Sequence, residues 1–240
     1  RILRDNKSLT RQAYVEFDLQ AMFDGEGYSD FVLFWLLCHQ SRVESDGPEP
    51  CWLEKWSKAA KQQGTRALDR LRTGVEEAIT ALGTGLLVHP ANARLRDRLQ
   101  SGALDLQDLY RELLRHVYRL LFLFVAEDRG LLHPAGASAA SRERYARFFS
   151  TQRLRQSALR LRGSRHGDLF AGHRLVIGWL GSAVGQPELG LPALGSLLFS
   201  TGAVPETGSC EIANRELLAA VRALAFTVDA GVRRAVDYRD

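Results

Sequence analysis

Four carboxylates lie close together near the start of the chain, at Glu16, Asp18, Asp24 and Glu26. Acidic side chains this close could hold a divalent metal ion, which is the chemistry of restriction-type nucleases. Such a site also needs a lysine, in an acid-x-lysine strand, that reaches the same metal, and no such strand accompanies these acids. We therefore expect them to be surface and turn residues rather than a metal centre.

A second acidic cluster, Glu127 and Asp128 beside Arg129, stands at the end of a strongly apolar stretch. Carboxylates on the last turn of a buried helix need a partner, because an unpaired buried charge is costly. The pattern favours an internal ion pair or a capping group over a catalytic site.

The other residues that could do chemistry are not spaced for it. The six histidines are scattered, and Cys38, Cys51 and Cys210 do not stand at metal-ligand spacing from one another or from a histidine. The glycine-rich loops GxGxxG and GxxxxGK[ST] and the Gly-x-Ser-x-Gly elbow do not occur in the sequence. The sequence thus predicts no catalytic, cofactor-binding or metal-binding residue in this chain.

Arginine is the one chemical signal that remains. Residues 142–174 hold nine arginines and only two acids, and the planar arginine fork suits phosphate. Arginines on one helical face would contact a nucleic-acid backbone without regard to its sequence. Equally open are a solvated helix face, pairing with acids elsewhere in the fold, and the arginine bias of a GC-rich genome. The phosphate-contact candidates are Arg153, Arg155, Arg160, Arg162 and Arg165.

The composition is that of a globular protein, with 45% hydrophobic and 25% charged residues, a net charge of +4 and a pI near 9.1. Apolar runs are far shorter than the roughly 20 residues that cross a bilayer, so we expect no membrane partner. Three cysteines make a disulfide framework improbable and favour a reducing, cytoplasmic location.

One stretch, residues 105–129, is expected to organise the fold. Its apolar residues recur with helical spacing, and the pattern becomes apolar all round from Leu120 to Ala126. Asp105 is a plausible N-cap and Gly130 a stop signal. The predicted fold class is mainly α, a helical bundle-like domain around one long central helix, with a short N-terminal β-hairpin remnant.

Further helices are expected on either side of this one. One runs from Tyr28 to about Arg42, and another starts near Trp52, is interrupted at Gly64 and stops at Gly83. Later helices are expected over 91–100, in one or two pieces over 142–163, over 168–185 and over 214–226. Residues 194–202 are ambiguous, and 235–240 form an extended tail.

Residues 1–19 alternate as two short strands would, separated by a polar turn. Two strands alone are marginal in water, so we expect them to end a sheet that lies upstream. The predicted division is 1–20, the trailing strands of an upstream domain, and 21–240, a helical connector. We expect the chain to be a region of a longer protein.

Several segments resemble one family. They are YVEFDLQAMFDGEGYSDFVLFWLLCHQSRV (14–43), LLRHVYRLLFLFVAEDRGLL (113–132), LGSLLFS (194–200), NRELLAAVRALAF (214–226) and VDYRD (236–240). Together they resemble the region upstream of the methyltransferase domain in Type IIG-like adenine-specific DNA methylases of restriction–modification and of BREX- and DISARM-type phage defence.

The resemblance implies a nuclease-like domain before this region and an S-adenosylmethionine-binding methyltransferase after it, acting on a base flipped from the duplex. The family's glycine-rich cofactor motif and Asn-Pro-Pro-aromatic motif do not occur here. Neither catalytic nor cofactor residues can therefore be assigned, and S-adenosylmethionine is implied for the parent protein alone.

Two functions follow as expectations. The first is a connector that positions such a methyltransferase on double-stranded DNA, with the five arginines touching phosphates. The alternative is a helical docking scaffold for other defence-system subunits that makes no nucleic-acid contact.

Overall fold

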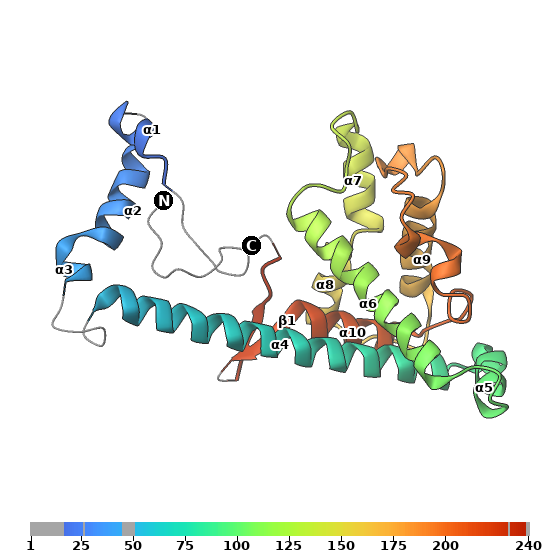
Figure 1. Ribbon diagram of the computed structural model, residues 1–240. Helices are drawn as coiled ribbons and strands as arrows, with labels where there is room; N and C mark the ends of the chain where they lie inside the picture. The colour runs from blue at the N-terminus through green and yellow to red at the C-terminus, as the bar shows by residue number, and fades with distance from the viewer. Residues whose placement is uncertain (1–16, 26, 45–50, 230, 239–240) are drawn as a thin grey trace. The chain divides into compact units, whose positions relative to one another are not determined.

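The computed structural model describes residues 17–25, 27–44, 51–229 and 231–238 (Figure 1). The chain divides into two compact units, residues 1–67 and 68–240. The domain boundary that we expected after residue 20 stays a prediction, because residues 1–16 lie outside the described part.

The first unit holds short helices. They are α1 (Leu19–Phe23), α2 (Tyr28–Cys38), α3 (Gln40–Val43) and the start of α4 (Trp52–Val88). The N-terminal hairpin falls almost wholly outside the described residues. Its last residue, Leu19, is helical instead of extended, because the Asp18 carboxylate accepts from the Ala21 N–H and caps α1.

The second unit contains the end of α4 and the remaining elements. These are η2 (Pro90–Asn92), α5 (Ala93–Gln100), α6 (Leu106–Asp128), α7 (Ala139–Phe148), α8 (Thr151–Arg160), α9 (Asp168–Gly181), η3 (Pro187–Leu189), η4 (Leu197–Phe199), η5 (Thr201–Ala203), α10 (Asn214–Ala225), β1 (Phe226–Asp229) and β2 (Val232–Ala235). The arginine-rich stretch 142–174 thus covers most of α7, all of α8, a loop and the start of α9, and the ambiguous segment 194–202 is 3-10 helical in part.

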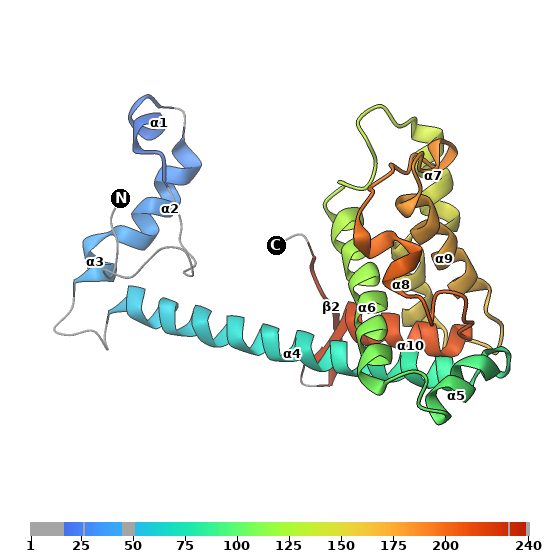
Figure 2. The same cartoon turned by 45° about the vertical axis from the view of Figure 1, so that its right-hand side comes forward.

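Helix α6 is the predicted central helix, and it takes part in both hydrophobic clusters of the core. Leu113, Val117 and Phe124 pack with α4, α8 and α10, whereas Leu123 and Ala126 pack with α7 and α9. Figure 2 shows α6 among the helices that follow it. A mainly helical fold around a long central helix is therefore confirmed.

The longest helix is α4, and the predicted break at Gly64 and stop at Gly83 are wrong, since α4 continues to Val88. Two of its glycines serve close packing. A Cβ on Gly74 would lie 2.4 Å from the Ala223 carbonyl oxygen, and one on Gly85 would lie 2.8 Å from Glu216 Cβ. Because neither glycine has a Cβ, α10 can pack directly on α4, and the two helices run side by side in both views (Figures 1 and 2).

The described sheet is a C-terminal hairpin in which β1 pairs antiparallel with β2, Phe226 facing Ala235. Residues 236–238 continue past it without regular structure. The Tyr238 hydroxyl donates to the Leu224 carbonyl at 2.8 Å, so the tail returns to α10.

Candidate nucleic-acid interface

Helix α8 separates the predicted arginines onto two faces. Leu154 and Ala158 are buried against the core, while Arg153 and Arg160 are exposed. Arg160 follows Arg153 by seven residues, which is almost two full helical turns, so the two side chains share a face of the helix. Arg155 lies about 200° away from Arg153 around the helix and turns inward.

Arg155 is held within the fold. Its Nη1 and Nη2 donate to the two Asp128 carboxylate oxygens at 2.9 and 2.6 Å, and its side chain is 14% exposed. The guanidinium also stands 5.0 Å from the centre of the Phe124 ring. A guanidinium that already binds a carboxylate with two bonds has little left for phosphate, so we leave Arg155 out of the interface.

The other candidates stand at or beyond the end of α8. We call residues 161–167 the arginine loop; it carries Arg162 and Arg165 and directly follows Arg160. All three side chains are exposed. Among the described residues, none of the three forms an ion pair.

Helix α10 fixes the far end of the arginine loop. The Asn214 and Arg215 backbone N–H groups donate to the carbonyls of His166 and Ser164, at 2.6 and 3.1 Å. These N–H groups belong to the first turn of α10 and have no partner within the helix. The buried Asn214 side chain also donates to Asp168 at 2.8 Å, which fixes the start of α9.

The same helix fixes the near end. Arg222 donates from Nε to the Ala158 carbonyl at 2.8 Å and from Nη2 to the Leu161 carbonyl at 2.7 Å. These carbonyls lie at the C-terminus of α8, where helical partners run out and a positive charge is favoured.

Gly163 lets the loop lie on α10. Its φ is +91°, and a Cβ there would stand 2.5 Å from Arg215 Cα. Only glycine adopts this conformation so close to another backbone without strain. The loop therefore presents its arginines from a fixed backbone.

Positive charge accumulates at the Arg162 end. The pKa of Arg222 is lowered by burial and by the charges of Arg233 and Arg162. In the part of the chain that the structure describes, Glu77 is the one acid that lines, with Arg222 and Arg233, an adjoining depression of about 310 Å³. A neighbouring phosphate would therefore meet several guanidinium groups and few competing carboxylates.

Arg153 occupies an intermediate position. Its side chain is exposed, yet Nη1 donates to the Phe148 carbonyl at 3.2 Å, at the end of α7. It remains a candidate for phosphate contact, but one hydrogen-bond donor is already used.

The acidic clusters have structural roles where they are described. Glu127 accepts from the Thr151 and Gln152 N–H groups at 2.7 and 2.8 Å and so caps α8, while Asp128 pairs with Arg155. This confirms the predicted capping and ion-pair role. Asp24 accepts from Gln20 in α1, and Glu16 and Glu26 lie outside the described residues.

Within the described residues, no group of three or more His, Cys, Asp or Glu side chains is placed to hold a metal ion. Among the helices of the same residues, none combines the length and apolar character needed to cross a membrane.

Arg222 and Arg233 were not among the predicted contacts. Both lie far along the sequence from the arginine-rich stretch. Arg222 reaches it because α10 packs on α8, and Arg233 stands near Arg222 because α10 leads into the hairpin. Their local sequence offers no signal for this, since a lone arginine on an amphipathic helix is ordinary.

Comparison of the chain with protein-family models, with curated proteins and with solved structures finds no match.

Proposed function

We propose that this chain is the helical, DNA-positioning region of a large adenine-specific DNA methyltransferase of a restriction–modification or phage-defence system. In this proposal the arginine loop, with Arg160 beside it, contacts the phosphate backbone. The enzyme class and the implied S-adenosylmethionine rest on the sequence resemblance alone. The DNA contact rests on the geometry.

The observation that carries the DNA contact is the absence of ion pairs at Arg160, Arg162 and Arg165 within the described residues, on a backbone fixed by α10. A fixed loop loses little conformational entropy on binding. Unpaired guanidinium groups release no internal partner when they bind phosphate. Such contacts hold a duplex in position and do not read its sequence.

The test is a charge-reversal variant, Arg160→Glu, Arg162→Glu and Arg165→Glu together. A matched control reverses Arg94, Arg129 and Arg144, which lie in α5, at the C-cap of α6 and in α7. All three are exposed, form no ion pair within the described residues, and change the net charge equally. Binding of a fluorescent duplex should weaken strongly in the loop variant and only slightly in the control. Equal weakening in both would assign the effect to net charge and not to the loop.

A second candidate function is a docking scaffold for other subunits, and α2 favours it. Among the described residues, this helix buries none of its side chains. Tyr28, Phe31 and Trp35 are exposed together with the intervening aliphatic residues, and apolar patches of this kind mark interaction surfaces. Binding of a hydrophobic dye that falls in a Phe31→Asp, Trp35→Asp variant, with no duplex binding at low salt, would favour the scaffold.

A further inference from the structure

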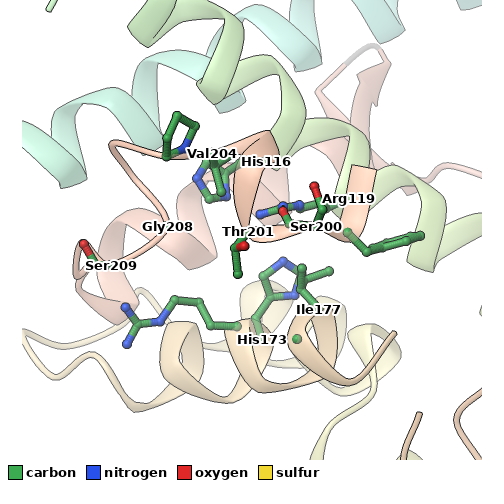
Figure 3. Close-up of a pocket in the computed structure, with 13 residues that line it drawn as sticks. His116, Arg119, His173, Ile177, Ser200, Thr201, Val204, Gly208 and Ser209 are labelled. Atoms are coloured by element: carbon green, nitrogen blue, oxygen red, sulfur yellow. The ribbon is translucent and has the colours of Figure 1, made fainter. Parts of the chain in front are cut away.

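A cavity of about 360 Å³ lies between α6, α9 and residues 199–209, apart from the arginine loop (Figure 3). Helix α6 contributes His116 and Arg119, and α9 contributes His173 and Arg174. Asp and Glu are absent from its lining within the described residues. The cavity is of the size that small-molecule sites commonly have.

His116 is held in one orientation by a chain of hydrogen bonds. The Thr207 hydroxyl donates to a Glu112 carboxylate oxygen at 2.7 Å, so it accepts from His116 Nε2, 2.9 Å away. The proton of the neutral ring is therefore on Nε2, which leaves Nδ1 as an acceptor. Among the described residues, Nδ1 has no hydrogen-bond partner.

His173 is 5% exposed and lines the same cavity. Its ring stands against Phe170, with 6.4 Å between the ring centres. Neither ring nitrogen has a hydrogen-bond partner among the described residues. Figure 3 shows both histidine rings turned toward one space, one from α6 and the other from α9.

Arg119 places a positive charge in the wall. Its side chain is 4% exposed, and it donates from Nε to the Leu198 carbonyl and from Nη2 to the Ser200 carbonyl, at 2.8 and 3.1 Å. In the described part of the chain, Nη1 has no partner and the guanidinium forms no ion pair. Burial and the charge of Arg115 lower the pKa of Arg119 to about 10, so it stays charged at neutral pH.

Within the described residues, no carboxylate is in direct contact with Arg119. Arg174 is paired with Glu211 at 2.7 Å. Glu112, whose charge acts on Arg119, already accepts from Thr207 and from the Glu206 N–H. Arg119 Nη1, His116 Nδ1 and the two His173 ring nitrogens are not sealed within the fold, so these groups, which have no partner in the described part of the chain, are open to a ligand in the cavity.

We propose that this cavity binds a small organic anion, a phosphate monoester or carboxylate with an apolar body. Arg119 Nη1 and the hydrogen-bonding atoms of His116 and His173 bind the charged group. Ile177, Phe199 and Val204 pack against the apolar body. This ligand site is separate from the DNA contact, and neither proposal depends on the other.

A substitution at Gly178 can obstruct the cavity. This residue lines the cavity from α9, and a Cβ built there meets no atom within 4 Å. Gly172, also in α9, has equally open space but does not line the cavity. Gly178 is exposed, so Gly178→Leu places a bulky side chain at the mouth of the cavity, and Gly172→Leu is the matched control for the change in helix propensity.

The experiment is calorimetric titration of the full chain with phenyl phosphate, benzoate, inorganic phosphate and phenol. At least one of phenyl phosphate and benzoate should bind, about tenfold or more tightly than phenol. The one with the higher affinity identifies whether the site prefers a phosphate or a carboxylate group. Inorganic phosphate should bind more weakly than phenyl phosphate. Gly178→Leu should weaken anion binding about tenfold or more, with Gly172→Leu near wild type.

The proposal is overturned if neither aromatic anion binds, if phenol binds equally well, or if Gly178→Leu binds like the control. Imidazole nitrogen NMR of the wild-type chain gives a readout that needs no variant. Phenyl phosphate or benzoate should shift the His116 and His173 ring signals and leave those of exposed His166 in place. Unchanged signals of both buried rings would also overturn it.

Discussion

Arg222 of α10 donates from Nη2 to the carbonyl of Leu161 at 2.7 Å, sixty-one residues earlier in the chain. The bond joins the last helix of the second unit to the start of the arginine loop. Since Arg222 also binds the Ala158 carbonyl, one side chain both ends α8 and sets where the loop begins.

Arg222→Met should therefore lower the free energy of unfolding by about 1–3 kcal/mol, because two charged hydrogen bonds to helix-end carbonyls are lost. Urea unfolding followed by circular dichroism measures this. Arg72→Met is the comparison, since its ion pair with Glu76 leaves the two side chains 79% and 62% exposed, and it should cost less than about 1 kcal/mol. Equal losses in the two variants would contradict a special role for Arg222.

Gly163→Ala should destabilise the protein by more than about 1 kcal/mol, because alanine at φ +91° is strained and its Cβ meets the Arg215 backbone. Duplex binding should weaken with it, since the loop must move. Gly136→Ala, where a Cβ meets no atom within 4 Å, should leave both unfolding and binding nearly unchanged. Wild-type behaviour of Gly163→Ala would show that the loop backbone is not fixed as described.

Much of the fold could be predicted from sequence because it depends on local pattern. The central helix followed from helical spacing between Asp105 and Gly130, and α6 indeed ends at Asp128 with Gly130 at φ +65°. The sequence pattern predicted a wrong helix end where glycines serve the packing of one helix on another. Gly83 resembled a stop signal, but α4 continues past it, and Gly85 allows the approach of Ile212 and Glu216.

The candidate interface was only partly predictable. Helical arithmetic alone separates Arg155 from Arg153 and Arg160, so its inward direction could have been read from the spacing. Its partner, Asp128, lies 27 residues away, and that pairing needs the packing of α6 on α8. The approach of Arg233 to Arg222 depends in the same way on the C-terminal hairpin.

Asp128→Ala should lower the free energy of unfolding by about 2–3 kcal/mol, less than for a fully buried pair, because the two side chains keep 14% and 22% exposure. Without the Asp128 carboxylate, the charge of Arg155 is unpaired. A double-mutant cycle with Arg155→Met measures the coupling, and the double variant should be less destabilised than the sum of the single ones. Strict additivity would contradict a direct interaction.

Acid should destabilise the fold through its two buried histidines. Burial and the charge of Arg119 lower the pKa of His116 to about 3 and that of His173 to about 4, from 6.5. As pH falls below 6.5, the unfolded chain takes up protons that the folded chain does not. Stability is therefore lost toward pH 4, by about 1.4 kcal/mol per pH unit for each histidine.

Urea midpoints between pH 7 and 4 measure this loss. His173→Gln should flatten the dependence, whereas His166→Gln, at an exposed position, should not. An unchanged slope in His173→Gln would show that the His173 ring is protonated in the folded protein.

The central claim is that the arginine loop contacts DNA phosphates, and a salt series tests it most directly. Duplex affinity should fall steeply as salt rises, with a slope of about 0.9 in log affinity against log salt concentration for each phosphate contact. The Arg160→Glu, Arg162→Glu, Arg165→Glu variant should bind more weakly and with a shallower slope, while the Arg94, Arg129 and Arg144 control keeps the wild-type slope. An unchanged slope in the loop variant, or no binding by the wild-type chain at low salt, would contradict the account.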